Sequence, residues 1–401
     1  MTGLLLSRGR RLRRRVERRL AGHDLVLIGA AVALAALGVL LVGAATRRHG
    51  VAFPARQGLW VLVGVGVMTA TAVVDLEVVR RGAHVLYLAG LAGLLLVLSP
   101  LGASTNGAQA WFSLGPLALQ PAELMKPVLV VALAAHGVRA GGPLDGRRLL
   151  GGLVLLGVPV GLVLLQPDLG TAMVLVSLTA GVVAVAGARA RHLAVLALLG
   201  VLAVAGVLRA GVLAPYQVER LTGFLHQSHD PRGATWNLEQ AKIAIGSGGI
   251  AGEGLFSGSQ TRLAYVPEQH TDFVFTVVGE ELGLVGGATV LALFALLAWR
   301  IWRVAWRSTD PFAALCCAGV LAMLVFQVTE NVGMTMGITP ITGIPLPFLS
   351  YGGSSMLASF AGVGLAANAA SRCRSGEAGK ARNWPRATGA NGLPAARLVT
   401  T

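Results

Sequence analysis

The feature that most constrains this chain is a series of apolar runs, each long enough to cross the roughly 30 Å hydrocarbon core of a bilayer. Hydrophobic residues make up 54% of its 401 residues and charged residues only 13%, with a mean hydropathy of +0.69. Such a sequence is typical of an all-α polytopic membrane protein. It predicts about ten transmembrane helices, at residues 24–45, 57–74, 82–99, 123–138, 149–165, 170–187, 192–212, 272–299, 311–337 and 355–370.

The distribution of Lys and Arg orients these spans, because positive residues near span ends stay on the cytoplasmic side. The arginine-rich start of the chain and its basic end are then both cytoplasmic, as an even number of spans requires. Arg80 and Arg81 lie in a predicted cytoplasmic segment. The first outer loop is an exception, since it carries Arg47, Arg48 and Arg56. Contact with lipid phosphates is the one explanation that the sequence offers for these three arginines.

The two ends of the chain account for most of the formal charge of +15. Residues 1–20 hold eight Arg against one Glu, and residues 372–401 hold six Lys and Arg against one Glu. A basic tail beside a span anchors to anionic lipid, which argues against nucleic acid as a partner. We therefore expect a basic cytoplasmic N-terminus (1–23), a transmembrane domain (24–371) and a basic, disordered cytoplasmic tail (372–401).

Signal cleavage and cysteine chemistry are not expected. The first apolar run has about twenty residues, more than the 7–15 of a cleavable signal core, and should remain as an anchor. Cys316, Cys317 and Cys373 lie in a span or in the cytoplasm, and their spacing fits neither a disulfide framework nor a metal site.

A cluster of carboxylates at the start of the span 272–299 indicates a functional site. Glu268, Asp272, Glu280 and Glu281 lie within fourteen residues, although charge is expensive where a membrane helix begins. For Asp272 the alternative is a helix cap.

Two further outward-facing segments carry charge. In residues 106–126, Glu123 and Lys126 are three residues apart and share a helix face. They either neutralise each other at a helix start or face an internal cavity. In residues 166–171, Asp168 is more simply a cap for the following helix than a catalytic group.

Two long irregular segments complete the outer face. The loop from about 215 to 271 contains a glycine-rich run that lacks the form of a nucleotide-binding loop, and its apolar stretch 241–250 should pack on the protein or membrane surface. Residues 340–355 hold three prolines and three glycines, yet are too apolar for a solvated loop. This composition predicts a re-entrant segment buried in protein, after a span that carries Gln327, Glu330 and Asn331.

Five motifs in this order resemble the SEDS proteins (shape, elongation, division and sporulation), the RodA/FtsW/SpoVE group of peptidoglycan glycosyltransferases. The motifs are GAQAWFSLGPLALQPAELMK, QPDLGT, AIGSGG, PEQHTDFVFTVVGEELGLVG and NVGMTMGITPITGIPLPFLSYGGSS. The resemblance covers most of residues 24–371. The pieces GAQ, ELMK, NVGM and ITGIPLPF are more similar to RodA, of the elongation machinery, than to FtsW, of the division septum. FLHQSHDP departs from the family by lacking its first Asp-Pro pair.

The resemblance implies an inverting glycosyltransferase of the bacterial cytoplasmic membrane that polymerises lipid II at the outer face. A GlcNAc 4-hydroxyl attacks the MurNAc C1 of a lipid-linked glycan, and undecaprenyl pyrophosphate leaves. Asp272 would be the general base. Lys126 and Arg220 would stabilise the leaving group, and Glu123 would hold Lys126 or share a divalent cation (Mg or Mn). The sequence has no DxD-type pair that would indicate such a metal by itself. The residues expected to bind substrate are Glu123, Lys126, Arg220, Trp111, Lys242, Gln327, Asn331 and Ser354.

The family also implies partners, namely a class B penicillin-binding protein that cross-links the product, other elongation proteins and membrane lipid. Two other functions remain open from the residues alone. A lipid II flippase could use the same charged cavity but needs no base at the outer face. A non-catalytic scaffold of the cell-wall machinery would make the outer carboxylates dispensable.

Overall fold

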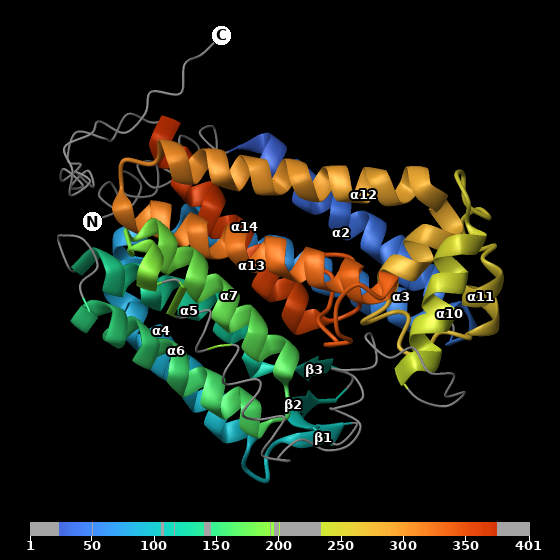
Figure 1. Cartoon of the computed structure of the whole chain (residues 1–401), viewed down its shortest axis with the longest axis horizontal. Helices are drawn as coiled ribbons and strands as arrows, with labels where there is room; N and C mark the ends of the chain where they lie inside the picture. Colours follow the sequence, from blue (N-terminus) through green and yellow to red (C-terminus); the bar gives the residue numbers. More distant parts are fainter. Residues whose placement is uncertain are drawn as a thin grey trace, which may run out of the picture.

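The computed structural model is a helical bundle with a small sheet and two short helices at one end (Figure 1). It describes residues 24–374 except 50, 106–107, 116, 140–145, 193, 196–199 and 201–233. The helices are α2 (Leu25–Ala45), η1 (Arg47–His49), α3 (Ala52–Val73), α4 (Leu76–Val97), α5 (Pro121–Arg139), α6 (Gly146–Leu165), α7 (Leu169–Val185), α10 (Ala234–Ser247), α11 (Ser259–Leu263), α12 (Val274–Arg307), α13 (Pro311–Met336) and α14 (Gly353–Arg374). The strands are β1 (Ala103–Thr105), β2 (Ala108–Leu114) and β3 (Leu117–Leu119).

The predicted polytopic helical architecture is confirmed at a coarse level. Within the described residues, seven helices are long and apolar enough to span a membrane, namely α2, α3, α4, α5, α6, α12 and α13. α7, with 17 residues, is shorter, and α14 is not apolar enough to be counted. Every predicted span overlaps helical residues, although in 192–212 the structure describes only residues 192, 194, 195 and 200. The count of ten spans and their orientation stay predictions.

Aspartate residues cap the N-termini of several helices. Each accepts a hydrogen bond from a main-chain N–H of the first turn, which satisfies one of the free donors at a helix start. The capping residues are Asp24, Asp75, Asp168 and Asp310. Two of them also tie helices together, because Arg300 of α12 binds Asp24 and Arg372 of α14 binds Asp75 at 2.7 Å. The capping interpretation of Asp168 is therefore correct.

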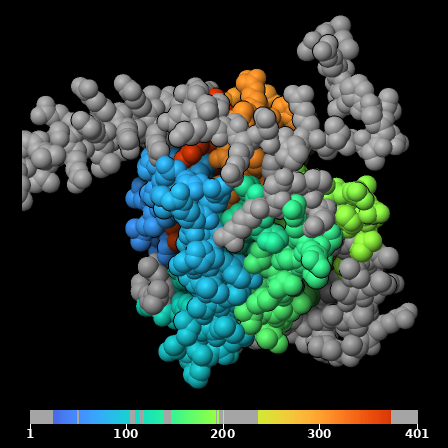
Figure 2. All heavy atoms as spheres, turned by 90° about the vertical axis from the view of Figure 1, so that its left-hand side faces the viewer, coloured from blue at the N-terminus to red at the C-terminus, as the bar shows by residue number. Residues whose placement is uncertain are grey.

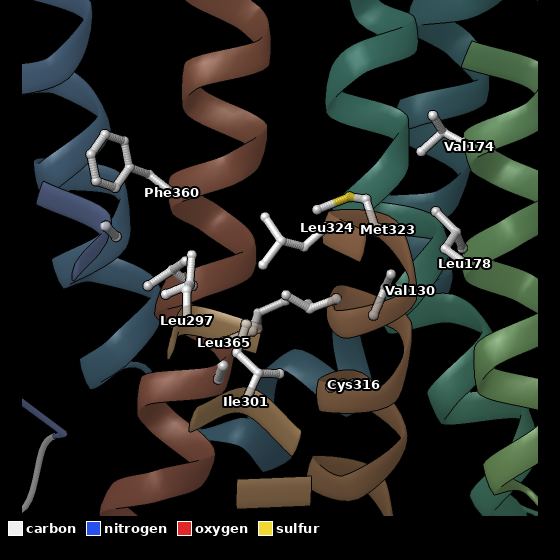
Figure 3. Close-up of a cluster of buried hydrophobic side chains, with 14 of the residues drawn as sticks. Val130, Val174, Leu178, Leu297, Ile301, Cys316, Met323, Leu324, Phe360 and Leu365 are labelled. Carbon is white, nitrogen blue, oxygen red and sulfur yellow. The ribbon is translucent and has the colours of Figure 1, made fainter. Parts of the chain in front are cut away.

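α13 lies at the centre of the bundle and packs on α5, α7, α12 and α14. Its buried side chains meet those of the neighbouring helices in the apolar core drawn in Figure 3, where Leu324 lies near Leu297 and Leu365. Cys316 and Cys317 are buried here as free thiols. On the outside, α4 and α6 lie side by side (Figure 2). They expose Leu and Val side chains such as Leu88 and Val154, as a lipid-facing layer does.

The prediction of a purely helical protein is wrong for residues 103–119. This segment forms an antiparallel sheet in the order β1, β2, β3, with Ala103 opposite Trp111 and Phe112 opposite Leu119. Gly115, with a φ of 66°, follows β2 and allows the chain to turn back. β2 carries two adjacent aromatic residues, which favour strands. The neighbouring strands satisfy its main chain outside the helical bundle.

The predicted span 272–299 also differs in two ways. Its helix runs on to Arg307, and it is interrupted at Gly283, which has a φ of 65° and a ψ of −162°. The predicted loop 215–271 contains α10 and α11, and α10 packs against α12 and α13. The apolar stretch 241–250, expected to pack on the protein or the membrane surface, packs on the protein in part: Ala241 and Ala244 are buried, whereas Ile243 and Ile250 are exposed.

Candidate active site

The break in α12 is filled by the glycine-rich run. In an unbroken helix the N–H groups of residues 284 and 285 would donate to the carbonyls of residues 280 and 281. Here they donate to Gly249 O (2.9 Å) and Ile250 O (3.1 Å) instead. The two released carbonyls accept from the N–H groups of residues 253 (2.9 Å) and 254 (3.0 Å). Residues 249–254 therefore lie alongside residues 280–285 as a short ladder, with every one of these backbone groups paired.

Glycine is required where the two segments meet. A Cβ on Gly248 would lie 1.9 Å from the carbonyl oxygen of Gly279, and one on Gly252 would lie 2.2 Å from that of Glu281. These contacts are far too short for any side chain. The glycines are explained by close backbone packing, in agreement with the prediction that they form no nucleotide-binding loop.

Glu280 and Glu281 anchor this loop to α12. Both side chains are fully buried. The Glu280 carboxylate accepts from Gln260 N (2.6 Å), Thr261 N (3.1 Å) and Thr261 Oγ1 (2.6 Å), and that of Glu281 accepts from Phe256 N (3.0 Å). Hydrogen bonds to a carboxylate are among the strong ones in proteins. Two of the four carboxylates predicted to form a site therefore hold structure instead.

Asp272 lies at the end of the loop that enters α12 and is partly exposed. Its carbonyl oxygen accepts from Asn331 Nδ2 at 2.7 Å, and its N–H donates to Glu268 O at 3.1 Å. Asn331 Nδ2 also donates to Ile344 O at 2.7 Å. The N-cap position of α12 belongs to Phe273, so the alternative of Asp272 as the N-cap residue is not supported. One buried amide on α13 thus joins the loop that carries Asp272 to the segment after α13.

The rest of this loop is held by aromatic and amide contacts. Tyr351 N donates to His270 O at 2.8 Å, and the rings of Phe53, His270 and Tyr351 lie with centroids 5.1 to 5.6 Å apart. Gln269 is buried, and its Nε2 donates to Thr261 Oγ1 at 2.9 Å and to Thr276 Oγ1 at 3.1 Å. The main chain around Asp272 is therefore fixed from several sides while the carboxylate stays partly exposed.

Residues 337–352 are non-helical and largely buried, as their sequence predicts. Side chains satisfy their main chain, because Gln57 Nε2 donates to Ser350 O (3.0 Å) and Ser350 Oγ accepts from Leu346 N (2.8 Å). Thr342 Oγ1 donates to the carboxylate of Glu330 at 3.1 Å. Buried irregular backbone of this kind is what membrane depth permits. A re-entrant path through the bilayer stays a prediction.

Glu123 and Lys126 form a buried ion pair in α5, with 2.5 Å between Lys126 Nζ and Glu123 Oε1. Their exposed fractions are 3% and 1%. The pairing expected from the spacing is confirmed. Glu123 Oε2 is buried without a hydrogen-bond partner in the described structure, as are Gln327 Oε1 and Asn331 Oδ1. Buried polar atoms without partners are uncommon and point to water, an ion or a ligand.

Helix packing sets Gln327 at the height of this ion pair. α5 and α13 contact each other, and a Cβ on Gly137 would touch Leu315 while one on Gly319 would touch Val130. The two helices are therefore antiparallel. Two more turns along α5 bring residues 123–126 level with residues 323–327 of α13.

A divalent cation has limited support. Among the described residues, no group of three or more His, Cys, Asp and Glu side chains is arranged to hold a metal. Glu123 Oε2 and Gln327 Oε1 are oxygen atoms of the kind that Mg²⁺ or Mn²⁺ accepts. One carboxylate oxygen and one amide oxygen fit an ion that substrate oxygens also bind, and do not fit a cage made by protein alone.

The remaining predicted site residues are dispersed. Ser354 Oγ accepts from Gln120 N (2.7 Å), and Gln120 Nε2 donates to the Asp168 carboxylate (2.9 Å), so Ser354 joins α14 to the start of α5. Trp111 is half-buried in β2. Lys242 of α10 lies against the C-terminal cap of α13, where a Cβ on Gly337 would be 2.9 Å from Lys242 Nζ. Arg220 lies outside the described residues.

Sequence reasoning missed the residues that position the loops. Gln57 and Gln269 were not singled out, and Glu330 was noted without a role. The signal was available for Gln57 and Glu330, because a polar side chain inside an apolar span usually has a specific partner. For Gln269, whose partners lie 7 and 8 residues away, no local pattern indicates the contacts.

The fold and this site define a multi-pass membrane protein with a buried polar region at one end of its helical bundle. Residues 22–375 match the FtsW/RodA/SpoVE family, described as cell cycle proteins. The chain belongs to this family, as its motifs predict.

Named relatives extend over most of the chain. A protein named probable peptidoglycan glycosyltransferase FtsW, from Trichlorobacter lovleyi, is 36% identical over 363 residues, which are 87% of this chain and 93% of that protein. Stage V sporulation protein E of Bacillus subtilis is 34% identical over 356 residues, 86% of this chain and 96% of that one. The prediction of a glycosyltransferase is thus confirmed at the level of the family.

Solved structures of similar fold also cover most of the chain. A chain of a structure described as "Structural coordination of polymerization and crosslinking by a peptidoglycan synthase complex" has a TM-score of 0.73 and 35% identity, and covers 88% of this chain and 98% of its own. Rod shape determining protein RodA of Thermus thermophilus has a TM-score of 0.66 and 31% identity, with the same coverage. FtsW, SpoVE and RodA all appear among the relatives, so the closer likeness to RodA stays a prediction.

Proposed function

We propose that this protein polymerises lipid II into glycan strands at the outer face of the bacterial cytoplasmic membrane. The observation that carries the proposal is the difference among the carboxylates around the start of α12. Glu280 and Glu281 are fully buried and bind the loop before them, whereas Asp272 is partly exposed on a loop held by Asn331 and Tyr351.

Asp272 serves as the general base in this proposal. A sugar hydroxyl is a weak nucleophile at neutral pH, so its proton must be taken as the new bond forms. The 4-hydroxyl of one GlcNAc attacks C1 of a lipid-linked MurNAc from the side opposite the leaving oxygen, which inverts that carbon. The proton goes to the Asp272 carboxylate, and undecaprenyl pyrophosphate leaves with the bonding electrons.

Cations on the same side of the bundle stabilise the developing charge on the pyrophosphate. Lys126 is the main candidate, and the Glu123 carboxylate holds its ammonium group in place. Lys242 and Arg220 are secondary candidates. Glu123 Oε2 and Gln327 Oε1 are the atoms that would hold a divalent cation, which would supply further positive charge for the leaving pyrophosphate. Trp111, Asn331 and Ser354 complete the proposed substrate contacts, with Asn331 acting mainly through the main chain of Asp272.

The membrane arrangement and partners follow from this role. The proposal requires ten spans, cytoplasmic termini, and the loop of about 215–271 outside the cell. A class B penicillin-binding protein that cross-links the strands is the proposed partner, supported by the likeness to a chain of a peptidoglycan synthase complex. The motif pieces nearer to RodA favour a role in cell elongation with other elongation proteins.

The decisive experiment compares Asp272→Asn with Glu268→Gln in purified protein supplied with lipid II, alone and with the cognate penicillin-binding protein. Asp272→Asn keeps the size of the side chain and removes its basicity, so polymerisation should fall by about 10²–10⁴-fold. Glu268, an exposed carboxylate four residues earlier, is the matched control and should keep most of the activity. Near-parental activity of Asp272→Asn would refute the assignment of the base.

The same assay separates this function from a lipid II flippase and from a scaffold. Glycan chains should form in detergent, where no sealed compartment exists and transport has no meaning. No product with an active partner present, together with lipid II translocation in sealed vesicles, would identify a transporter. If neither polymerisation nor translocation is detected, the non-catalytic scaffold is the remaining function.

A further inference from the structure

Two of the three arginines in the first outer loop, Arg47 and Arg48, share a pocket with a third arginine, Arg262. Arg47 and Arg48 follow the end of α2, and Arg262 is in the last turn of α11, more than two hundred residues later. All three line one pocket, together with Ser259, Thr261 and apolar residues of both elements. Its volume is about 520 Å³, within the range of about 300–1,000 Å³ usual for small-molecule sites.

We call this site the arginine pocket; it contains Arg47, Arg48 and Arg262 with Ser259 and Thr261. Its arginines are only partly engaged by other groups of the protein. Arg47 donates to Phe256 O at 3.0 Å, which fixes it against the loop. Arg48 and Arg262 are exposed, and neither forms an ion pair with any residue that the structure describes. Two guanidinium groups are therefore available to a ligand.

The carboxylates nearby are already engaged. Glu280 accepts hydrogen bonds from Gln260 N, Thr261 N and Thr261 Oγ1, and Glu253 accepts from Ser259 N at 2.9 Å. Glu281, which interacts with the charge of Arg47, accepts from Phe256 N. Because these acidic groups bind main-chain donors, they hold the wall of the pocket, while Arg48 and Arg262 line it as exposed residues.

The position of the pocket points to a lipid. It lies where the apolar helix α2 ends, and Ala44, Ala45 and Leu263 form part of its wall. Large apolar side chains are exposed around it, with exposed fractions of 48% for Leu40, 38% for Phe256 and 48% for Leu263. A cationic pocket with an apolar flank, at the height where a span ends, fits a headgroup whose hydrocarbon chain remains in the bilayer.

We propose that the arginine pocket binds the phosphate of a membrane lipid. Guanidinium groups present planar, paired donors that match phosphate oxygens. The Ser259 hydroxyl, whose hydrogen bond to Glu253 is long at 3.4 Å, adds a neutral donor. The Thr261 hydroxyl already donates to Glu280 and only forms part of the wall. The site uses none of the residues assigned to catalysis, so it stands apart from the proposed role of Asp272. The phosphate can belong to a phospholipid or to a polyprenyl carrier, and binding measurements distinguish the two.

The test measures binding of short-chain probes to the purified full-length protein in a neutral detergent. The probes are dioctanoyl phosphatidylglycerol, farnesyl diphosphate, and dioctanoylglycerol as the phosphate-free control. The variants are Arg48→Gln, Arg262→Gln and their combination, with Arg307→Gln as the matched control, an exposed arginine at the far end of α12. Each pocket variant should weaken phosphate binding about tenfold, equal to about 1.4 kcal/mol, while Arg307→Gln leaves it unchanged.

The outcomes are separable. Losses for both phosphate probes indicate recognition of any lipid phosphate, a loss for phosphatidylglycerol alone assigns the site to phospholipid, and a loss for farnesyl diphosphate alone assigns it to the polyprenyl carrier. Arg48→Lys with Arg262→Lys should retain part of the affinity, and unchanged melting temperatures will show that all variants are folded. Equal binding of dioctanoylglycerol, or phosphate binding that the double variant does not reduce, would overturn the proposal. Asp272→Asn should bind the probes normally even though it is expected to be inactive.

Discussion

The apolar core of the bundle and the loop end (residues 248–285 and 337–352) are held together by different forces. In the core, Leu297 of α12 and Leu365 of α14 are buried in one apolar cluster with Leu324 of α13, and regular helices satisfy their own main chain. At the loop end the main chain is irregular. Its carbonyls and N–H groups are satisfied by single side chains, such as Asn331 and Glu280, and by the ladder of residues 249–254 with 280–285.

This difference predicts how each region tolerates change. Core stability depends on buried area and volume, so a substitution there alters the free energy of unfolding and little else. At the loop end a single atom determines where a loop lies, so a substitution there changes the position of Asp272 as well as stability. The predictions below test this division.

The largest effect is expected from Lys126→Met, because it leaves the Glu123 carboxylate buried without its partner. Breaking a buried ion pair from one side costs about 3–5 kcal/mol, so the melting temperature and the yield of folded protein should fall sharply. Adding Glu123→Gln should restore both. If Lys126 also faces the leaving group, this double variant folds yet stays inactive, and Lys126→Arg retains more activity than Lys126→Met. A fully active double variant would remove both residues from the site.

In the apolar core, Leu297→Ala should cost about 3 kcal/mol, because it removes a fully buried side chain and leaves a cavity. Thermal unfolding in detergent measures this loss. The activity per folded molecule should remain close to that of the parent protein. A large loss of specific activity in folded Leu297→Ala would show that the two regions are coupled.

At the loop end, Gly248→Ala should cost about 2–3 kcal/mol, because its Cβ would lie 1.9 Å from a main-chain oxygen of α12. Gly246, two residues earlier in α10, has no atom near its Cβ position. Gly246→Ala should therefore be neutral or stabilising by up to about 1 kcal/mol. Melting temperatures that change equally in the two variants would contradict the close contact between residues 248 and 279.

The smallest loss of stability is expected from Asn331→Ala, about 1–2 kcal/mol for the two main-chain hydrogen bonds that its amide donates. Its effect on polymerisation should be larger than that of Leu297→Ala, since Asp272 loses its main-chain support. The measurement is activity per folded molecule, with each variant assayed at a temperature equally far below its own melting temperature. The division between the regions fails if Asn331→Ala is destabilised but fully active.

Local features of this chain could be predicted from its sequence. The Glu123–Lys126 pair depends only on helix geometry, and Asp168 caps the helix that it precedes. The buried irregular segment after α13 follows from its prolines, glycines and apolar side chains. The sheet at 103–119 could not be predicted, because short strands are defined by pairing rather than by pattern. Thr261, the partner of Glu280, is 19 residues away, so the carboxylate that anchors a loop could not be told from a catalytic one.

The interruption of α12 at Gly283 divides this helix into two parts with different partners. In residues 274–282, the side chains and carbonyls of Glu280 and Glu281 bind the loop before α12. In residues 284–307, Arg300 binds Asp24 at the start of α2. The ladder bridges the break, because residues 249–254 bond to main-chain groups on both sides of Gly283. The missing turn of the helix is thus replaced by hydrogen bonds from another segment, so the two parts of α12 stay connected by more than the covalent chain.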